Sequence, residues 1–195
     1  MPGLTESLGL LERSTAYALT AVADIGPTAW HASTTCADWD LTALLQHLLD
    51  GLEALCEGLC GAVVAPPDAW TPGPEDRDLT GAFRRRASAL LAACGHAGAP
   101  DRRVVVGTRL LDTSMLVLAG AVELAVHGWD VRRACGTPRP IPPRLATELL
   151  DVCRILVDED NRQPQFGPAV AVPPSAPAGD RLVAFLARQP YADGS

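Results

Sequence analysis

A stripe of leucines between residues 41 and 59 restricts the fold of this chain more than any other feature of its sequence. The leucines recur every three or four residues, which places them on one face of an α-helix. A helix with such a face must bury it against other elements. Asp38 or Asp40 is expected to accept the first hydrogen bonds of this helix, and Gly61 to end it. The stripe consists of Leu41, Leu44, Leu45, Leu48, Leu52, Leu55 and Leu59.

Four further segments show helical periodicity, and a short helix is expected near the end of the chain. The first is expected to be capped by Thr5, and the last long one to open at Pro142 or Pro143, because proline is tolerated in a first turn. Residues 102–107 are prone to extended structure and are predicted to form a connector. The predicted helices cover residues 4–23, 79–94, 112–134, 143–156 and 180–188.

Several striped helices with little strand signal predict an all-α fold, namely an up-and-down four-helix bundle with a short C-terminal extension. We expect one domain over residues 1–195, with a core at about 4–158 and a tail with a short helix at 159–195. A chain of 195 residues buries enough apolar surface to fold without metal or disulfides. Any metal site therefore needs a functional explanation.

Charge and cysteine content exclude several classes of protein. The formal net charge is −7, and a broad phosphate-binding surface needs the opposite sign, so nucleic acid is not an expected partner. The N-terminal residues are not expected to form a secretory signal, and no apolar run reaches the roughly 20 residues that span a bilayer. The protein is therefore predicted to be cytoplasmic and to have no membrane partner. The six cysteines contain no Cys-x-x-Cys pair and are interpreted mostly as buried apolar residues.

Three polar residues lie on one side of the predicted helix 112–134. Glu123, His127 and Asp130 fall within a sector of about 60° at 100° per residue. Ligands four residues apart on a helix present their donor atoms to one point, as in helical zinc motifs. Asp130 lies one turn beyond His127 and is a candidate to orient its imidazole. The alternative is a surface carboxylate paired with Arg132 or Arg133.

His47 is the best candidate for a third ligand, because it lies at the edge of the leucine stripe on a facing helix. Bundles build metal sites from such inward polar residues. His47, Glu123 and His127 would leave one coordination position open, which is typical of a catalytic site. The alternatives are an exposed helical pair and a histidine that is satisfied at the edge of the core.

Four motifs, in order and spacing over nearly the whole chain, resemble one known family. They are Cys-Ala-Asp-Trp-Asp at 36–40 before His47, Glu-Leu-Ala-Val-His-Gly-Trp-Asp at 123–130, Phe-Gly-Pro at 166–168, and Arg-Leu-Val-Ala-Phe-Leu-Ala-Arg-Gln-Pro at 181–190. The sequence resembles the actinobacterial, DinB-like metal-binding family related to mycothiol-dependent maleylpyruvate isomerase. The resemblance implies a DinB/YfiT-like four-helix bundle with its metal ligands at His47, Glu123 and His127.

The resemblance also implies a chemistry. A divalent metal, with zinc as the first expectation, would activate a low-molecular-weight thiol, mycothiol, for attack on a small electrophile. Release of the thiol after bond rotation would be isomerisation, whereas its retention would be S-transfer. The alternatives are metal-assisted hydrolysis, with Asp130 or Glu123 orienting water, and a bundle that binds a small molecule without catalysis. The expected assembly is a monomer or a homodimer.

Overall fold

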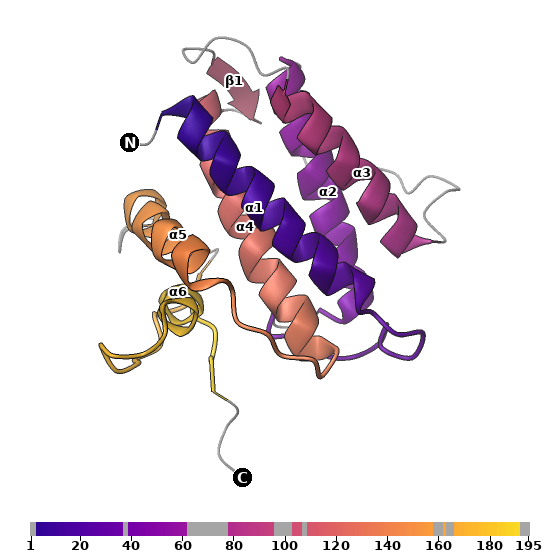
Figure 1. Ribbon diagram of the computed structural model, residues 1–195, viewed down its shortest axis with the longest axis vertical. Helices are drawn as coiled ribbons and strands as arrows, with labels where there is room; N and C mark the ends of the chain where they lie inside the picture. Colours follow the sequence, from indigo (N-terminus) through magenta and orange to yellow (C-terminus); the bar gives the residue numbers. More distant parts are fainter. Residues whose placement is uncertain are drawn as a thin grey trace.

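The prediction of an all-α fold is confirmed by a computed structural model, which describes residues 3–36, 39–61, 78–95, 103–106, 109–157, 162 and 166–191. Four long helices make the bundle and two shorter ones lie beside it (Figure 1). The bundle helices are α1 (Leu4–Ala23), α2 (Leu41–Cys60), α3 (Leu79–Gly95) and α4 (Thr113–Ala134), followed by α5 (Pro143–Leu156) and α6 (Ala178–Phe185).

The order of the helices round the bundle brings α2 against α4. Helices α1 and α2 each pack against both α3 and α4, so consecutive helices α1 and α2 lie across a diagonal. Helices α1 and α4 run in one direction, and α2 and α3 run in the other (Figure 1). The consecutive helices α2 and α3 are therefore parallel neighbours, so the simple up-and-down order expected from the sequence is wrong. The antiparallel pair α2 and α4 carries the candidate ligands.

Helix α2 forms as its sequence predicts. The side chain of Asp40 accepts a hydrogen bond from the backbone N–H of Ala43 at 2.9 Å, and Gly61 ends the helix in the left-handed conformation with φ of 85°. Asp38 lies outside the described residues. All seven leucines of the stripe are buried, and Leu49 joins them.

Helix α4 is the central helix of the bundle. It is the one described helix whose length and composition would let it cross a membrane, but 72% of its most apolar 18-residue window is buried inside the protein. Glycines on α4 allow close packing, since a Cβ atom at Gly128 would lie 3.2 Å from the Cα of Ala18 on α1. A Cβ atom at Gly120 would lie 2.5 Å from a methyl carbon of Leu55 on α2. The apolar character of α4 therefore reflects its place in the core.

Four further details of the sequence-based prediction are wrong. Helix α1 begins at Leu4 with Gly3 as its N-cap, so Thr5 lies inside it. The predicted connector contains strand β1 (Arg103–Val106), which pairs antiparallel with β2 (Arg109–Asp112). Helix α6 begins two residues before Asp180 and ends at Phe185. Of the six cysteines, all free, only Cys94 and Cys153 are buried.

The segment after α6 turns back towards the bundle. Ala187 has a φ of 66°, the only positive φ of a non-glycine residue in the described part of the chain. The backbone N–H of Arg188 donates to the carbonyl of Val183 at 2.9 Å, which closes the turn. Arg162 is buried and donates to the carbonyl of Phe185 at 2.8 Å. These contacts fix the position from which Arg188 reaches α4.

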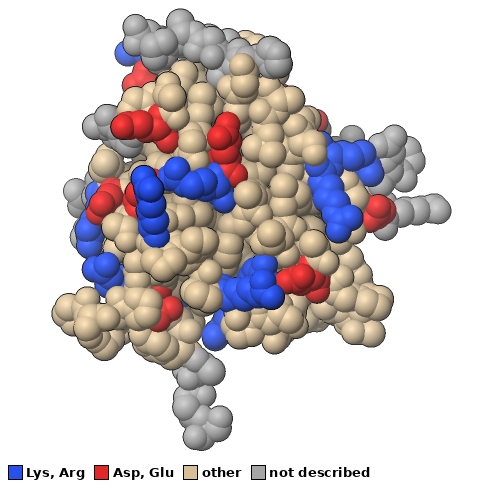
Figure 2. All heavy atoms as spheres, viewed as in Figure 1, with Lys and Arg blue, Asp and Glu red and all other residues tan. Residues whose placement is uncertain are grey.

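The surface carries both signs of charge. On the face shown in Figure 2, acidic and basic side chains are interspersed, and all the basic ones are arginines because the chain has no lysine. Arg84 and Arg85 are exposed on α3, whereas Arg86 lies 3.6 Å from Glu53 in an ion pair with α2.

Candidate metal centre

Helices α2 and α4 bring His47, Glu123 and His127 together. The Nε2 atom of His127 lies 2.9 Å from Oε2 of Glu123, and the Nε2 atom of His47 lies 3.5 Å from the same oxygen. One donor atom from each residue lies within 4.8 Å of the other two. The two residues four positions apart on α4 and the histidine on the facing helix α2 thus lie next to one another, as expected from the sequence.

The three side chains differ in exposure. The side chain of His127 is 9% exposed, whereas those of Glu123 and His47 are 48% and 43% exposed. The imidazole of His47 is held from both sides, with its centroid 4.9 Å from that of Trp39 and 5.1 Å from that of His127. The cluster is therefore anchored in the core on one side and open to solvent on the other.

Asp130 holds the far side of the His127 imidazole. Its Oδ2 atom lies 2.9 Å from Nδ1 of His127, and the carboxylate is fully buried. A proton on Nδ1 would leave the lone pair of Nε2 directed at Glu123 and His47. Arg132 pairs instead with Asp24 at 2.7 Å, and Arg133 lies over the ring of Trp129. The surface-carboxylate alternative for Asp130 is therefore wrong.

Arg188 and Thr35 complete the surroundings of Asp130. The guanidinium of Arg188 donates to Oδ2 of Asp130 at 3.1 Å, and the hydroxyl of Thr35 donates to Oδ1. Burial opposes ionisation of the carboxyl group, but the hydrogen bond from His127 and the charge of Arg188 outweigh it and lower the pKa of Asp130. The carboxylate stays charged at neutral pH and is compensated within the protein.

The same network shifts the pKa values of His127 and Glu123. Burial lowers the pKa of His127, but hydrogen bonds with Asp130, Cys36 and Glu123 outweigh it and raise that pKa well above 6.5. Burial raises the pKa of Glu123, but hydrogen bonds with His127 and His47 outweigh it and lower that pKa below the ordinary value of a glutamate. Without a metal, His127 is therefore protonated and Glu123 is ionised at neutral pH, and the two side chains form an ion pair.

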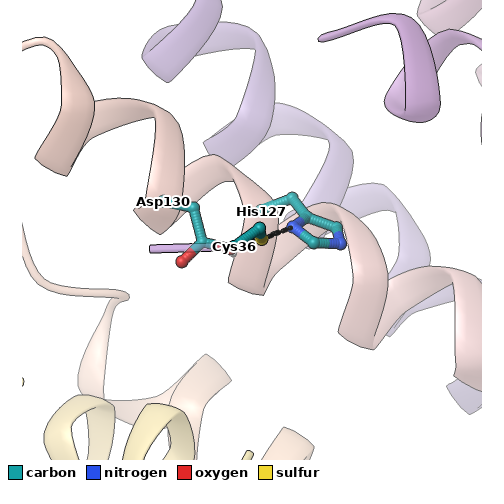
Figure 3. Close-up of side chains that lie close together, drawn as sticks. All are labelled: Cys36, His127 and Asp130. Atoms are coloured by element: carbon teal, nitrogen blue, oxygen red, sulfur yellow. Dashed lines mark hydrogen bonds and ion pairs between the residues drawn. The ribbon is translucent and has the colours of Figure 1, made fainter. Parts of the chain in front are cut away.

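Cys36 also lies beside this network, although nothing in the sequence pattern marks it as a site residue. Its Sγ atom faces the imidazole of His127 at 3.9 Å from Nδ1, with Asp130 on the same helix (Figure 3). The thiol donates to Oδ2 of Asp130 at 3.7 Å and accepts from Arg188 at 3.7 Å. Cys36 and Arg188 both fall in the family-like motifs, but helical periodicity gave no sign that they meet.

A pocket of about 660 Å³ opens over the cluster. Its walls come from the segment before α2, from α2 and α4, and from the segments before and after α6. Apolar side chains such as that of Phe166 line it together with polar ones such as that of Arg188. Trp39 lines it, whereas Trp129 is buried packing and Trp30 lies against the core. Trp70 and His96 lie outside the described residues, and the imidazole of His31 is exposed near Asp40.

The donor set fits a zinc-type ion. Donors around tetrahedral zinc lie about 3.4 Å apart, given metal–ligand distances of about 2.0–2.2 Å. The separations of 2.9 and 3.5 Å at Glu123 lie close to that value. Cys36, His127 and Asp130 form a second such group within 4.8 Å. The guanidinium of Arg188 touches both Cys36 and Asp130 and would repel a cation there, so the first group is the better metal centre.

Comparisons with known proteins point to one family. The model of the mycothiol maleylpyruvate isomerase N-terminal domain matches residues 11–132, which is more than half of the chain. Two uncharacterized proteins from two strains of Mycobacterium tuberculosis are each 28% identical over 157 residues, or 80% of this chain and 82% of theirs.

Solved structures agree with the fold. Crystal structures of the mycothiol-dependent maleylpyruvate isomerase and of a histidine-to-alanine mutant of it each match with a TM-score of 0.58 and 17% sequence identity. The match covers 77% of this chain and 68% of each of those chains. At this level of identity, the similarity establishes a shared helical fold.

Proposed function

Because this chain belongs to the family of the mycothiol maleylpyruvate isomerase N-terminal domain, we propose that it is a metal-dependent enzyme that uses a low-molecular-weight thiol. The thiol, mycothiol by analogy with the matched isomerase, would attack a small electrophile in a reaction of S-transfer or isomerisation. The observation that carries the proposal is the convergence of His47, Glu123 and His127 at the floor of the large pocket. A cytoplasmic location remains a prediction.

His47, Glu123 and His127 would hold a divalent ion, for which zinc is our first choice because two imidazoles and a carboxylate are common zinc ligands. Such an ion supplies Lewis-acid chemistry, which favours the deprotonated form of a thiol or of water. Asp130 would fix the ring of His127, and Arg188 would keep Asp130 ionised. The half-exposed side chains of Glu123 and His47 leave the site accessible from the pocket.

Activation of the thiol accounts for a small part of the expected acceleration. A thiol with a pKa of about 8.5 is already roughly 3% ionised at neutral pH, so full ionisation gains only about 30-fold. Holding thiol and electrophile together contributes more, since effective molarities reach about 10⁵ M. The pocket walls, including Trp39 and Arg188, are therefore proposed to position the reactants.

Turnover with a generic electrophile tests the proposed function. The zinc-loaded protein is expected to accelerate attack of mycothiol on 1-chloro-2,4-dinitrobenzene, in which a C–S bond forms, chloride leaves and the thiol proton passes to solvent. The rate should fall about 30-fold, the gain that full ionisation of the thiol supplies, after the metal is removed with a chelator. It should return with added zinc, as followed by the absorbance of the thioether. Turnover with water in place of the thiol would support hydrolysis instead. Absence of both reactions over a panel of electrophiles would favour a binding protein.

Metal binding is expected to weaken as the pH falls. The raised pKa of His127 means that a proton occupies its imidazole at neutral pH, and an incoming metal must displace it. The dissociation constant should therefore rise about tenfold for each pH unit lost below that pKa. Competition with a chromophoric chelator between about pH 6 and 8 measures this slope. The Asp130→Asn variant should show a shallower slope, because Asp130 is the main group that raises the pKa. Affinity that is independent of pH would contradict this assignment.

A further inference from the structure

A second, smaller cavity adjoins the candidate metal centre on the side away from Arg188. It is a groove of about 170 Å³ between α2 and α4, and the surface that lines it is almost entirely apolar. His47 and Glu123 line both this groove and the large pocket. These two candidate ligands therefore stand at the junction of a polar space and an apolar one.

Small residues on the two helices create the groove. Gly51 and Ala119 form its exposed rims on α2 and α4, and the buried side chains of Leu55 and Leu116 form its floor. A Cβ atom at Gly51 would have no neighbour within 4 Å, so the space beside it is free. Because Gly120 has no side chain, the side chain of Leu55 packs directly against the backbone of α4 and leaves the space above it open.

The size and lining of the groove restrict what it accepts. A cavity of about 150 Å³ lined by apolar side chains takes up one benzene ring. A groove of 170 Å³ thus has room for about six carbon atoms. Glu123 and His47, at the end next to the candidate metal centre, are the polar residues among those that line it, so a charged group would lack a partner elsewhere in the groove. The large pocket, in contrast, is lined by polar side chains that include those of Thr35 and Arg188.

We infer that this groove binds an apolar substituent of the electrophilic substrate, such as one aromatic ring or an alkyl chain of about six carbons, while the thiol occupies the large pocket. This inference rests on the proposed metal-dependent function and specifies its substrate class. The substituent and the thiol are assigned to different cavities because His47 and Glu123 line both of them. A substrate held at these two residues can therefore extend into the groove and into the large pocket.

A series of straight-chain alkyl hydroxamates, from acetohydroxamate to octanohydroxamate, tests the inference by direct binding. The hydroxamate head chelates zinc, and the alkyl tail probes the groove. On the zinc-loaded protein, calorimetry should show the dissociation constant falling about two- to fourfold for each added methylene, up to about six carbons, and levelling afterwards. Affinity that does not change with chain length would overturn the inference.

Leucine substitutions on the two rims locate the tail. The Gly51→Leu and Ala119→Leu variants should lose the chain-length dependence but keep full zinc content and the wild-type affinity for acetohydroxamate. The Ala89→Leu variant is the matched control, since Ala89 is an exposed alanine on α3 away from both cavities, and it should retain the dependence. A dependence that survives both rim substitutions would place the tail in the large pocket and overturn the inference.

The acetohydroxamate measurement separates this inference from the proposed function. Binding of acetohydroxamate that requires zinc, without any effect of chain length, contradicts the groove assignment and leaves the metal-dependent function standing. Failure of acetohydroxamate to bind the protein after incubation with zinc contradicts the metal centre, and the substrate class is lost with it.

Discussion

Replacing His47 with alanine is expected to abolish stoichiometric metal binding while the helical content of the protein stays unchanged. The imidazole supplies one of three donors, and its loss should cost more than the roughly 10- to 100-fold that follows from removing an outer hydrogen-bond partner. The fold should tolerate the change, because the side chain is 43% exposed and alanine is the best helix former. Metal analysis of dialysed protein and far-ultraviolet circular dichroism measure the two quantities.

His31→Ala is the matched control for this experiment. It removes a histidine whose side chain is 91% exposed and whose neighbour is Asp40, away from the candidate ligands. The control should bind one divalent ion per chain with wild-type affinity. One bound metal per chain in His47→Ala would show that the ligand set is wrong.

Substitution of Asp130 by asparagine is expected to weaken metal binding by about 10- to 100-fold. It should also lower the free energy of unfolding by about 3–5 kcal/mol, because the guanidinium of Arg188 is left buried without its counter-charge. The pKa of Asp130 is lowered in the folded protein, so the stabilisation is present above the ordinary value of about 4 and is lost as the pH falls through the folded value. The stability difference from wild type should therefore shrink under acidic conditions.

Two further variants separate the roles of Asp130. Asp130→Asn combined with Arg188→Met removes the uncompensated charge and should recover most of the stability but not the metal affinity. Asp151→Asn breaks the exposed pair of Asp151 with Arg154 and should cost at most about 1 kcal/mol, with metal affinity unchanged. Urea denaturation and chelator competition give both readouts. Unchanged metal affinity in Asp130→Asn would show that Asp130 does not orient the ligand.

The helices and the candidate ligands could be predicted because their signals are local. The spacing of the leucines between Leu41 and Leu59 predicts α2, and Asp40 and Gly61 mark its ends. Glu123 and His127 share a face of α4 because four residues make about one helical turn. His47 required one more assumption, that α2 and α4 face each other, and the structure brings the three side chains together.

The remaining contacts could not be predicted because they join segments without periodicity. Arg188 reaches Asp130 only because the chain turns at Ala187, where a non-glycine residue adopts a positive φ that no sequence pattern announces. Cys36 precedes α2 and resembles any small apolar residue until its neighbours are known. The pairing of β1 with β2 could not be predicted for a related reason. Residues 109–112 show no alternation of apolar and polar side chains, which is the sequence signal of a half-buried strand.

The buried carboxylate of Asp130 has a consequence for how the protein folds. Its partners Arg188 and Thr35 lie 58 and 95 residues away along the chain, so two long loops must close before the network is complete. Loop closure costs entropy that only the finished contacts repay, and contacts of high sequence separation form slowly. Contacts inside the bundle close even longer loops, such as the 108 residues between Asp24 and Arg132. We therefore expect the network around Asp130 and the helical bundle to be completed in the same cooperative step of folding.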